Sequence, residues 1–323
     1  MINIFTELKN RISGNLPLFI LQNASKGNDW FSAIEIQTAI GAICRTMLSH
    51  NALEEWALNY PNLPRKKQES VLIVMAGNIP LVGFFDLLCV LMAGDRAIVK
   101  PSHKDLALMV WIIGELKFIE PNIPINITYN ERESDVDRVI ATGSESAVKY
   151  FKQIYNGLPT LLRGSRHSVA VISSELESLD GLERDIYTYS GLGCRNVSMI
   201  FVPTRYDVSK IPSSYTNQKY RNNYLQNKAL LTMNNVEFVD NGVSCLIESY
   251  EFPTQISTIA IARYTTIEEV EAWIERNDKK IQCIVAGQKT INHPRRVNFG
   301  EAQYPTLYDY ADGIDTMKFL END

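Results

Sequence analysis

Short apolar runs alternate with helix-like segments between residues 70 and 155, and this alternation constrains the fold more than any other feature. The run Val71–Met75 is rich in β-branched residues, and Arg96–Lys100 follows it after a segment with helical spacing. Such runs are typical of strands buried in a parallel sheet, and their alternation with helices predicts a doubly wound α/β lobe. The strands expected here are 71–75, 96–100, 125–129 and 138–141, and the helices are 81–93, about 105–118 and 145–155.

A second α/β lobe is predicted after residue 160, where the alternation resumes. Its expected strands are 169–172, 199–202, 258–263 and 282–286, its helices are 182–189 and 267–276, and 204–227 is a polar segment rich in Tyr and Asn. Residues 1–60 have helical spacing. We therefore divide the chain into residues 1–160 (N-terminal helices and the first lobe), 161–290 (the second lobe) and 291–323 (a segment returning to the first lobe).

Composition and charge indicate an ordinary globular protein. Hydrophobic residues make up 45% of the 323 residues, and the net charge of −5 gives no reason to expect nucleic acid or an anionic membrane as a partner. No apolar stretch is long enough for a membrane span, and the N-terminus does not resemble a signal peptide. The five cysteines lack disulfide or zinc spacing, so we expect free thiols, no metal site and a cytoplasmic location.

Cys194 is the cysteine with the most unusual surroundings. It lies between Gly193 and Arg195, in a turn expected after a helix and before a strand. Glycine lets a backbone turn sharply, and a neighbouring guanidinium favours a thiolate. Cys89 and Cys283, by contrast, lie in apolar runs typical of the core. Local context alone leaves two interpretations of Cys194 open, namely a reactive thiol and an inert buried side chain.

Three polar turns follow predicted strands, at the edge of a parallel sheet where ligands usually bind. Asn78 is either a hydrogen-bond donor to an oxyanion or an ordinary turn residue, and Lys100 is either a ribose or phosphate ligand or a solvated lysine. Thr142-Gly143-Ser144 precedes a helix, so Ser144 is either a plain cap or part of a pyrophosphate site. The usual glycine-rich dinucleotide and P-loop motifs are absent.

Taken in order, these segments resemble the aldehyde dehydrogenase superfamily, and most closely its acyl-CoA reductase branch, which includes the fatty-acid reductase subunit of bacterial luminescence. The order and spacing agree from about residue 70 to 275, with a weaker match at YTTIEEV (264–270). The matching segments are MAGNIPL (75–81), IVKPS (98–102), ATGS (141–144), LRGSR (162–166) and GLGCR (191–195). The resemblance implies two doubly wound lobes of the aldehyde dehydrogenase type, with the dinucleotide-binding domain in residues 1–160 and the catalytic cysteine domain in residues 161–290.

The resemblance also implies roles for individual residues. Cys194 would be the nucleophile, and Asn78 would donate to the oxyanion together with the Cys194 backbone N–H. Lys100 would hold the adenosine ribose, with Ser102 and His103 beside it. The turn Thr142-Gly143-Ser144 would begin the helix that faces the cofactor pyrophosphate. Neither Glu248 nor Glu251 aligns cleanly with the family glutamate that binds the nicotinamide ribose.

Two departures from the family pattern refine the expected activity. Leu162 stands where hydrolytic aldehyde dehydrogenases have a glutamate base, so an acyl-enzyme should survive water. His103 stands where NAD-preferring relatives often have a glutamate, and it would tolerate a 2′-phosphate, which favours NADPH over NADH.

We therefore expect NADPH-dependent reduction of an acyl-CoA to an aldehyde through a thioester on Cys194. NADH remains an alternative cofactor, and an acyl-donating protein remains an alternative to CoA. A homo-oligomer is also expected. The two rival functions are an aldehyde-oxidising dehydrogenase and a non-catalytic binding or assembly protein with a degenerate fold.

Overall fold

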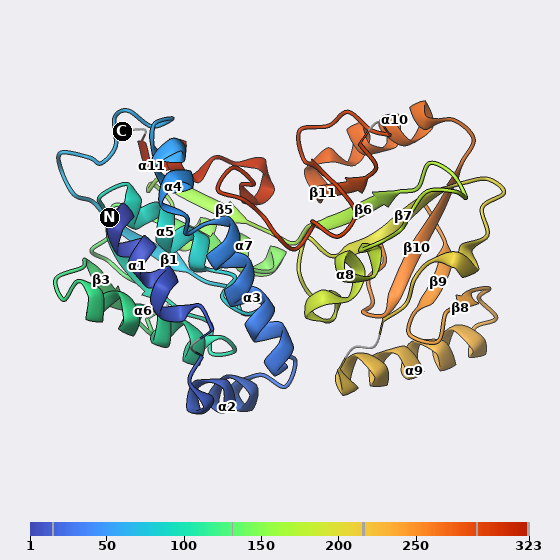
Figure 1. Cartoon of the computed structure of the whole chain (residues 1–323), viewed down its shortest axis with the longest axis horizontal. Coiled ribbons are helices and arrows are strands. Elements are labelled where there is room, and N and C mark those ends of the chain that lie inside the picture. The colour runs from blue at the N-terminus through green and yellow to red at the C-terminus, as the bar shows by residue number, and fades with distance from the viewer. Residues whose placement is uncertain (15, 131, 215–216, 289, 322–323) are drawn as a thin grey trace. The chain divides into compact units, whose positions relative to one another are not determined.

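The protein is described here by a computed structural model covering residues 1–14, 16–130, 132–214, 217–288 and 290–321. The chain forms two compact units: unit 1 contains Met1–Ser165 and the chain from Pro305 onward, and unit 2 contains Arg166–Tyr304 (Figure 1). The boundaries predicted from the sequence, 160/161 and 290/291, differ from these. Each unit is an α/β layer structure built on a mainly parallel sheet, which confirms the predicted fold class.

Unit 1 is built on a five-stranded parallel sheet of order β3-β2-β1-β4-β5. From β1 in the middle, the chain forms β2 and β3 on one side and then returns to form β4 and β5 on the other side. The sheet therefore has a topological switch point between β1 and β4. Its strands are β1 (Ser70–Val74), β2 (Arg96–Lys100), β3 (Ile125–Ile127), β4 (Arg138–Thr142) and β5 (Thr160–Arg163).

Different helices cover the two faces of this sheet, and successive side chains of β1 point alternately to one face and to the other. Val71 and Ile73 are buried in the large core that includes residues of α1 to α6 and α11, whereas Leu72 and Val74 pack against Phe151 and Tyr155 on the other face. The helices of unit 1 are α1 (Ile2–Ile12), α2 (Leu18–Gly27), α3 (Ala33–Thr46), α4 (His50–Ala57), α5 (Phe84–Met92), α6 (Leu106–Ile119), α7 (Glu145–Ile154) and α11 (Thr316–Glu321).

Strand β5 was not expected from the sequence, because its last residue is charged. Arg163 is nevertheless buried, and its Nη1 donates to both carboxylate oxygens of Asp86 in α5, at 2.6 and 2.7 Å. Its Nη2 donates to Thr316 Oγ1 in α11. The partners that make this arginine a core residue lie far away in the sequence. This strand belongs to the first sheet, which places the unit boundary after residue 165.

Unit 2 is built on a seven-stranded sheet of order β12-β11-β6-β7-β10-β9-β8. All its pairings are parallel except the short antiparallel pair β8–β9 at one edge. Residues before 305 remain in unit 2 because β12 pairs with β11. The strands are β6 (His167–Val171), β7 (Val197–Pro203), β8 (Val239–Asp240), β9 (Cys245–Glu248), β10 (Thr258–Tyr264), β11 (Ile281–Ala286) and β12 (Arg296–Val297).

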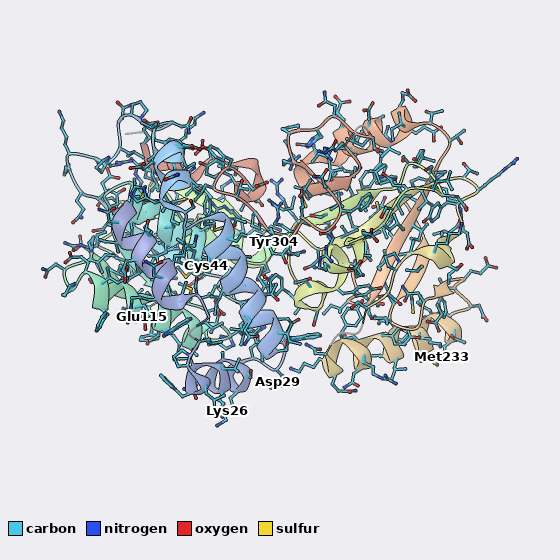
Figure 2. All side chains as sticks on the ribbon, viewed as in Figure 1. Lys26, Asp29, Cys44, Glu115, Met233 and Tyr304 are labelled. Carbon is cyan, nitrogen blue, oxygen red and sulfur yellow. The ribbon has the colours of Figure 1, made fainter. Side chains whose placement is uncertain are left out.

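The helices of unit 2 are α8 (Leu182–Tyr187), α9 (Gln218–Met233) and α10 (Ile267–Asn277). The long helix α9 lies where the sequence predicted only a polar segment, because few of its side chains are buried. Tyr220, Tyr224 and Asn227 make up its buried side, whereas Met233, labelled at its C-terminal end in Figure 2, is 78% exposed. Residues 215 and 216 of the predicted polar segment lie outside the described residues. Across the described ranges, every helix is too short or too polar to cross a membrane.

Candidate functional site

The candidate residues of unit 1 lie at one edge of its sheet, where β1, β2 and β4 end. Val74 at the end of β1 is paired with Lys100 on one side and with Ala141 on the other, so the three strand ends are level. Since neighbouring strands lie about 4.8 Å apart, the backbones of Lys100 and Ala141 are separated by about 10 Å. The turns that carry Asn78, Ser102 and Thr142–Ser144 therefore form one group, at the switch point of the sheet.

The turn after β1 is held tightly against the turn after β2. A Cβ atom on Gly77 would lie 2.5 Å from Ser102 Oγ, so only glycine fits at this position. The Gly77 carbonyl accepts a hydrogen bond from Asn28 Nδ2 at 3.3 Å. The next residue, Asn78, is exposed at the edge of the sheet. The backbone of this turn is thus packed on both sides, and Asn78 is an exposed residue beside it.

The N-terminus of α7 has the features of a phosphate-binding helix start. Ser144 is the N-cap, and its Oγ accepts the N–H of Ala147 at 3.3 Å. A Cβ on Gly143 would lie 2.9 Å from the Cβ of Ala147, so the residue must be small. The remaining N–H groups of the first turn have no intrahelical partner and suit an anion, although the exposed Glu145 reduces the local positive potential.

The turn after β2 presents a cation and two further polar side chains. Lys100 is partly buried at the end of the strand, and His103 is exposed. Ser102 Oγ accepts the N–H of Lys104 at 3.3 Å, which fixes the turn locally. Lys100 is therefore a partly buried cation in the same group of turns as Thr142–Ser144, with β1 between their strands.

Cys194 lies in unit 2, in the turn that leads from α8 into β7. It is partly exposed, whereas Cys44, Cys89, Cys245 and Cys283 are buried. Burial raises the pKa of Cys89 well above its usual range and that of Cys245 to about 11, so these thiols are poor nucleophiles. Exposure therefore distinguishes Cys194 from the other cysteines.

Asn196 holds the Cys194 turn together, a role that sequence reasoning missed. Its side chain is buried, and Oδ1 accepts the N–H of Gly193 at 2.8 Å. Its Nδ2 donates to the carbonyls of Thr188, Ile186 and Asp185, at 2.8, 3.1 and 3.2 Å. One amide side chain thus joins the end of α8 to the turn that presents the thiol.

Ser168 is a second buried residue that the sequence did not reveal. Its Oγ donates to the Cys194 carbonyl at 2.9 Å and accepts the N–H of Cys283 at 3.1 Å. It therefore connects the carbonyl side of Cys194 to strands β6 and β11. A serine inside an apolar strand carries no local signal of such a role, because both partners are distant in the sequence.

The backbone before Cys194 is left-handed at three consecutive residues. The φ angles of Tyr189, Ser190 and Gly191 are 55°, 54° and 68°, where the sequence predicted a helix up to residue 189. Each non-glycine residue in this region costs about 1–3 kcal/mol and needs support from its surroundings. The side chains of Tyr189 and Ser190 are both buried, which provides that support.

The segment 300–302 packs onto the same turn. Arg195 Nε donates to the Ala302 carbonyl, so the guanidinium that we expected beside the thiol is bound to the backbone. The carboxylate of Asp185 accepts the N–H groups of Gly300 and Ala302, at 2.6 and 2.9 Å. Burial raises the pKa of Asp185 to about 7, although these two hydrogen bonds oppose the shift.

The structure thus brings seven candidates together in unit 1 and places Cys194 in unit 2: the seven are Asn78, Lys100, Ser102, His103, Thr142, Gly143 and Ser144.

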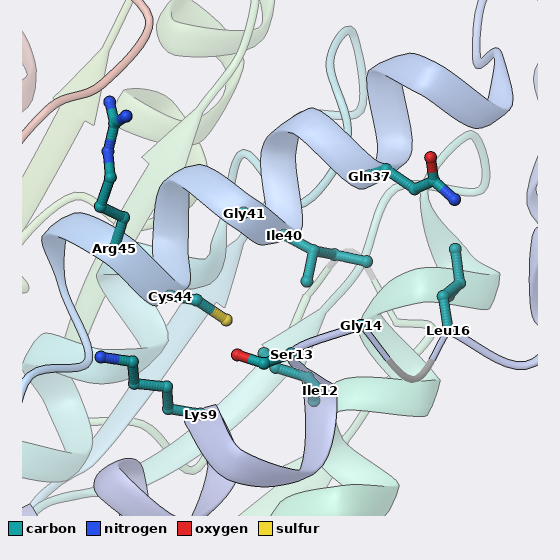
Figure 3. Close-up of a pocket in the computed structure, with 10 residues that line it drawn as sticks. All are labelled: Lys9, Ile12, Ser13, Gly14, Leu16, Gln37, Ile40, Gly41, Cys44 and Arg45. Atoms are coloured by element: carbon teal, nitrogen blue, oxygen red, sulfur yellow. The ribbon is translucent and has the colours of Figure 1, made fainter.

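A separate pocket of about 530 Å³ lies in unit 1 between α1 and α3, where the side chains of Cys44 and Ser13 point toward one another (Figure 3). None of the seven candidates lines this pocket. Within the described ranges, no cluster of His, Cys, Asp and Glu is placed to hold a metal.

Comparison with solved structures shows the aldehyde dehydrogenase fold. A Burkholderia cenocepacia protein described as an aldehyde dehydrogenase superposes with a TM-score of 0.65 at 14% identity, over 91% of this chain and 75% of that one. The NAD+ complex of an aldehyde dehydrogenase from Bacillus cereus gives 0.63 at 13% identity, over 89% and 71%. The NADP-dependent glyceraldehyde-3-phosphate dehydrogenase from Bacillus halodurans C-125, complexed with NADP, gives 0.62 at 10% identity, over 89% and 73%.

Comparison with curated proteins gives no match. A family model described as acyl-CoA reductase (LuxC) matches residues 42–212, which is more than half of the chain. The matched range contains Asn78, Lys100, the turn 142–144 and Cys194. The chain therefore belongs to the acyl-CoA reductase (LuxC) family.

Proposed function

We propose that this protein reduces an acyl-CoA to the aldehyde with NADPH, through a thioester on Cys194. The observation that supports this most is the coincidence of two independent facts. The family match runs through residue 194, and Cys194 is the partly exposed cysteine while the other four are buried. A thiol must be accessible to attack a substrate carbonyl, and the buried thiols do not meet this requirement.

In the first step, the Cys194 thiolate attacks the carbonyl carbon of the acyl-CoA, and the carbonyl oxygen becomes an oxyanion. The side-chain amide of Asn78 and the backbone N–H of Cys194 donate to that oxygen, each worth about 3–4 kcal/mol when well aligned. The tetrahedral intermediate then expels CoA as a thiolate. Because a thiolate is a good leaving group, the step needs no strong general acid.

The residues at the sheet edge of unit 1 fit a dinucleotide. The small turn 142–144 and the start of α7 suit the pyrophosphate, Lys100 suits the adenosine ribose, and His103 tolerates a 2′-phosphate. When bound there, NADPH would supply the hydride that the Cys194 thioester accepts, and the tetrahedral oxyanion formed on Cys194 would collapse to the aldehyde and the Cys194 thiolate.

Leu162 determines the fate of the acyl-enzyme in this proposal. It lies in β5 and packs against the apolar core beside Val139 and Phe151. A leucine cannot activate water, so the thioester is not hydrolysed quickly and remains available for reduction. The rival function, aldehyde oxidation to a free acid, needs a base that this position does not supply.

The proposal is tested by intact mass spectrometry after mixing the protein with acyl-CoAs of graded chain length and no cofactor. We expect one acyl adduct in the wild type, none in Cys194→Ala, and an unchanged adduct in the matched control Cys245→Ala, which removes a buried thiol of the same unit. An adduct that persists in Cys194→Ala, or NADPH oxidation that survives this substitution, would refute the mechanism.

A further inference from the structure

Asp105 is a buried carboxylate that contacts the turn carrying Asn78. It is 2% exposed, and its Oδ2 accepts the backbone N–H of Leu81 at 2.9 Å. Its Oδ1 has no hydrogen-bond partner among the described residues. A buried carboxyl group with one unsatisfied oxygen is costly, so its retention calls for a reason beyond ordinary packing.

Helix capping does not supply that reason. Asp105 is the N-cap residue of α6, a position where an aspartate side chain normally accepts an N–H of its own helix. Here the side chain makes no such bond and turns to Leu81 instead, 24 residues earlier in the chain. The carboxyl group therefore stabilises the β1–α5 connection rather than its own helix.

Leu81 needs this support because its backbone is left-handed. Its φ angle is 57°, a region that branched side chains rarely adopt, and its side chain is buried. The same connection is packed closely at both ends, where a Cβ on Gly77 would collide with Ser102 and a Cβ on Gly83 would collide with Met75. Between these two glycines, the hydrogen bond to Asp105 fixes the direction of the peptide before Leu81.

We infer that Asp105 is a positioning residue, which holds the Asn78 turn in its working geometry through the backbone of Leu81. The inference rests on the role proposed for Asn78 as an oxyanion donor. In this inference, loss of the hydrogen bond to Asp105 lets the backbone at Leu81 relax and shifts the turn that carries Asn78. A misplacement of about 1 Å can cost a factor of about 100 in rate.

The state of the carboxyl group suggests which substitution preserves this role. Burial raises the pKa of Asp105 well above its usual range, while the Leu81 N–H opposes the shift. The shift favours the neutral acid relative to an exposed aspartate, and the carbonyl oxygen of a neutral acid can still accept the N–H. An asparagine offers the same acceptor in the same shape, whereas a leucine of similar size offers none.

The experiment measures the rate of Cys194 acylation by rapid quench and intact mass spectrometry, per folded molecule, with the full chain and no cofactor. Asp105→Leu should slow acylation by up to about 100-fold with little change in the acyl-CoA concentration at half-maximal rate. Asp105→Asn should stay close to the wild type. Asp105→Ala removes the acceptor without adding bulk, and it serves if the leucine variant folds poorly.

Asp95 provides a matched control in the same unit, because it lies directly before the start of β2 and not in the turns after the strands. It is fully buried, and its Oδ1 accepts the backbone N–H of Glu69 at 3.0 Å. Asp95→Leu should lower stability without slowing acylation. If Asp105→Leu and Asp95→Leu slow acylation equally, or if Asp105→Asn is as slow as Asp105→Leu, the positioning role is wrong.

A double-mutant cycle with Asn78→Ala separates this inference from the proposal on which it rests. If Asp105 acts through Asn78, then Asp105→Leu should slow acylation no further once Asn78 is alanine. Effects that multiply in the double mutant would overturn the positioning role and leave the donor role of Asn78 intact. An Asn78→Ala variant that acylates at the wild-type rate would refute the donor role itself, and this inference with it.

Discussion

Replacing Asn196 by aspartate should both destabilise unit 2 and slow the acylation of Cys194. The change keeps the shape of the side chain and the acceptor for the Gly193 N–H, but it removes the donors that reach the three carbonyls at the end of α8. An amide nitrogen has two hydrogens, so at most two of the three contacts are full hydrogen bonds.

The magnitude follows from these contacts. Each buried carbonyl that loses its partner costs about 1–3 kcal/mol, so two of them give a loss of about 2–6 kcal/mol in the free energy of unfolding. This is a large part of the total stability of a domain, which is about 5–15 kcal/mol. The melting temperature should fall by about 5–20 °C. Acylation of Cys194 should slow by about tenfold or more, because the turn that presents the thiol is no longer joined to α8.

Urea unfolding followed by circular dichroism measures the stability, and the acyl-adduct assay measures the rate. Asn223→Asp is the matched control, since Asn223 Nδ2 makes one hydrogen bond, to the Lys219 carbonyl within α9. This variant should stay within about 0.5 kcal/mol of the wild type. An Asn196→Asp protein with wild-type stability would show that the three carbonyls do not depend on this amide, and the reasoning would fail.

Three further changes have defined outcomes. Gly77→Ala should lower the urea midpoint by the equivalent of about 1–3 kcal/mol because its Cβ would collide with Ser102, whereas Gly27→Ala, with open space around it, should be neutral or stabilising. Between about pH 4 and pH 7 the native state keeps a proton on Asp185 that the unfolded chain releases, because the pKa of Asp185 is raised to about 7. The free energy of unfolding that this group contributes should therefore fall by up to about 4 kcal/mol as the pH rises. Asp185→Asn should remove this pH dependence from urea unfolding curves, and an unchanged pH dependence would contradict the raised pKa. His103→Glu should raise the KM for NADPH by about tenfold or more through repulsion of the 2′-phosphate and leave the KM for NADH unchanged; equal effects on both cofactors would count against the proposed NADPH preference.

The sequence was most informative where a residue's role depends on its neighbours in the chain. The apolar run 71–75 predicted β1, because a strand buried on both faces needs a continuous apolar pattern, and Arg96–Lys100 is β2 as expected. The predicted helix 267–276 is α10, whose buried Val270, Trp273 and Ile274 have helical spacing. These elements suffice for the fold class.

The failures have a common physical cause. Strand β5 ends in Arg163, which is a core residue only because Asp86 and Thr316 neutralise and bind it from far along the chain. Helix α9 has a mostly exposed surface, so it lacks the apolar periodicity that identifies a helix. Tertiary partners decide both cases, and a local pattern does not contain them.

The same limit applies to the site. The motif residues Asn78, Lys100 and Cys194 were predicted from short segments of the sequence, because each lies at or just after the end of a predicted strand or helix. Asn196 and Asp105 were not chosen at all, because each supports another residue through backbone groups that only the folded chain brings near. Supporting residues of this kind are visible only in three dimensions.

Unit 1 is interrupted by the whole of unit 2, and this affects how the chain folds on the ribosome. Its core needs Leu307, Met317 and Leu320, and Asp315 accepts a hydrogen bond from Tyr60. These residues are synthesised after all of unit 2, so unit 2 can fold first while the nascent unit 1 still exposes the apolar surface that the last segment covers. For protein engineering, Arg166–Tyr304 is a single continuous piece to express, whereas an isolated unit 1 requires a linker that rejoins Ser165 to Pro305.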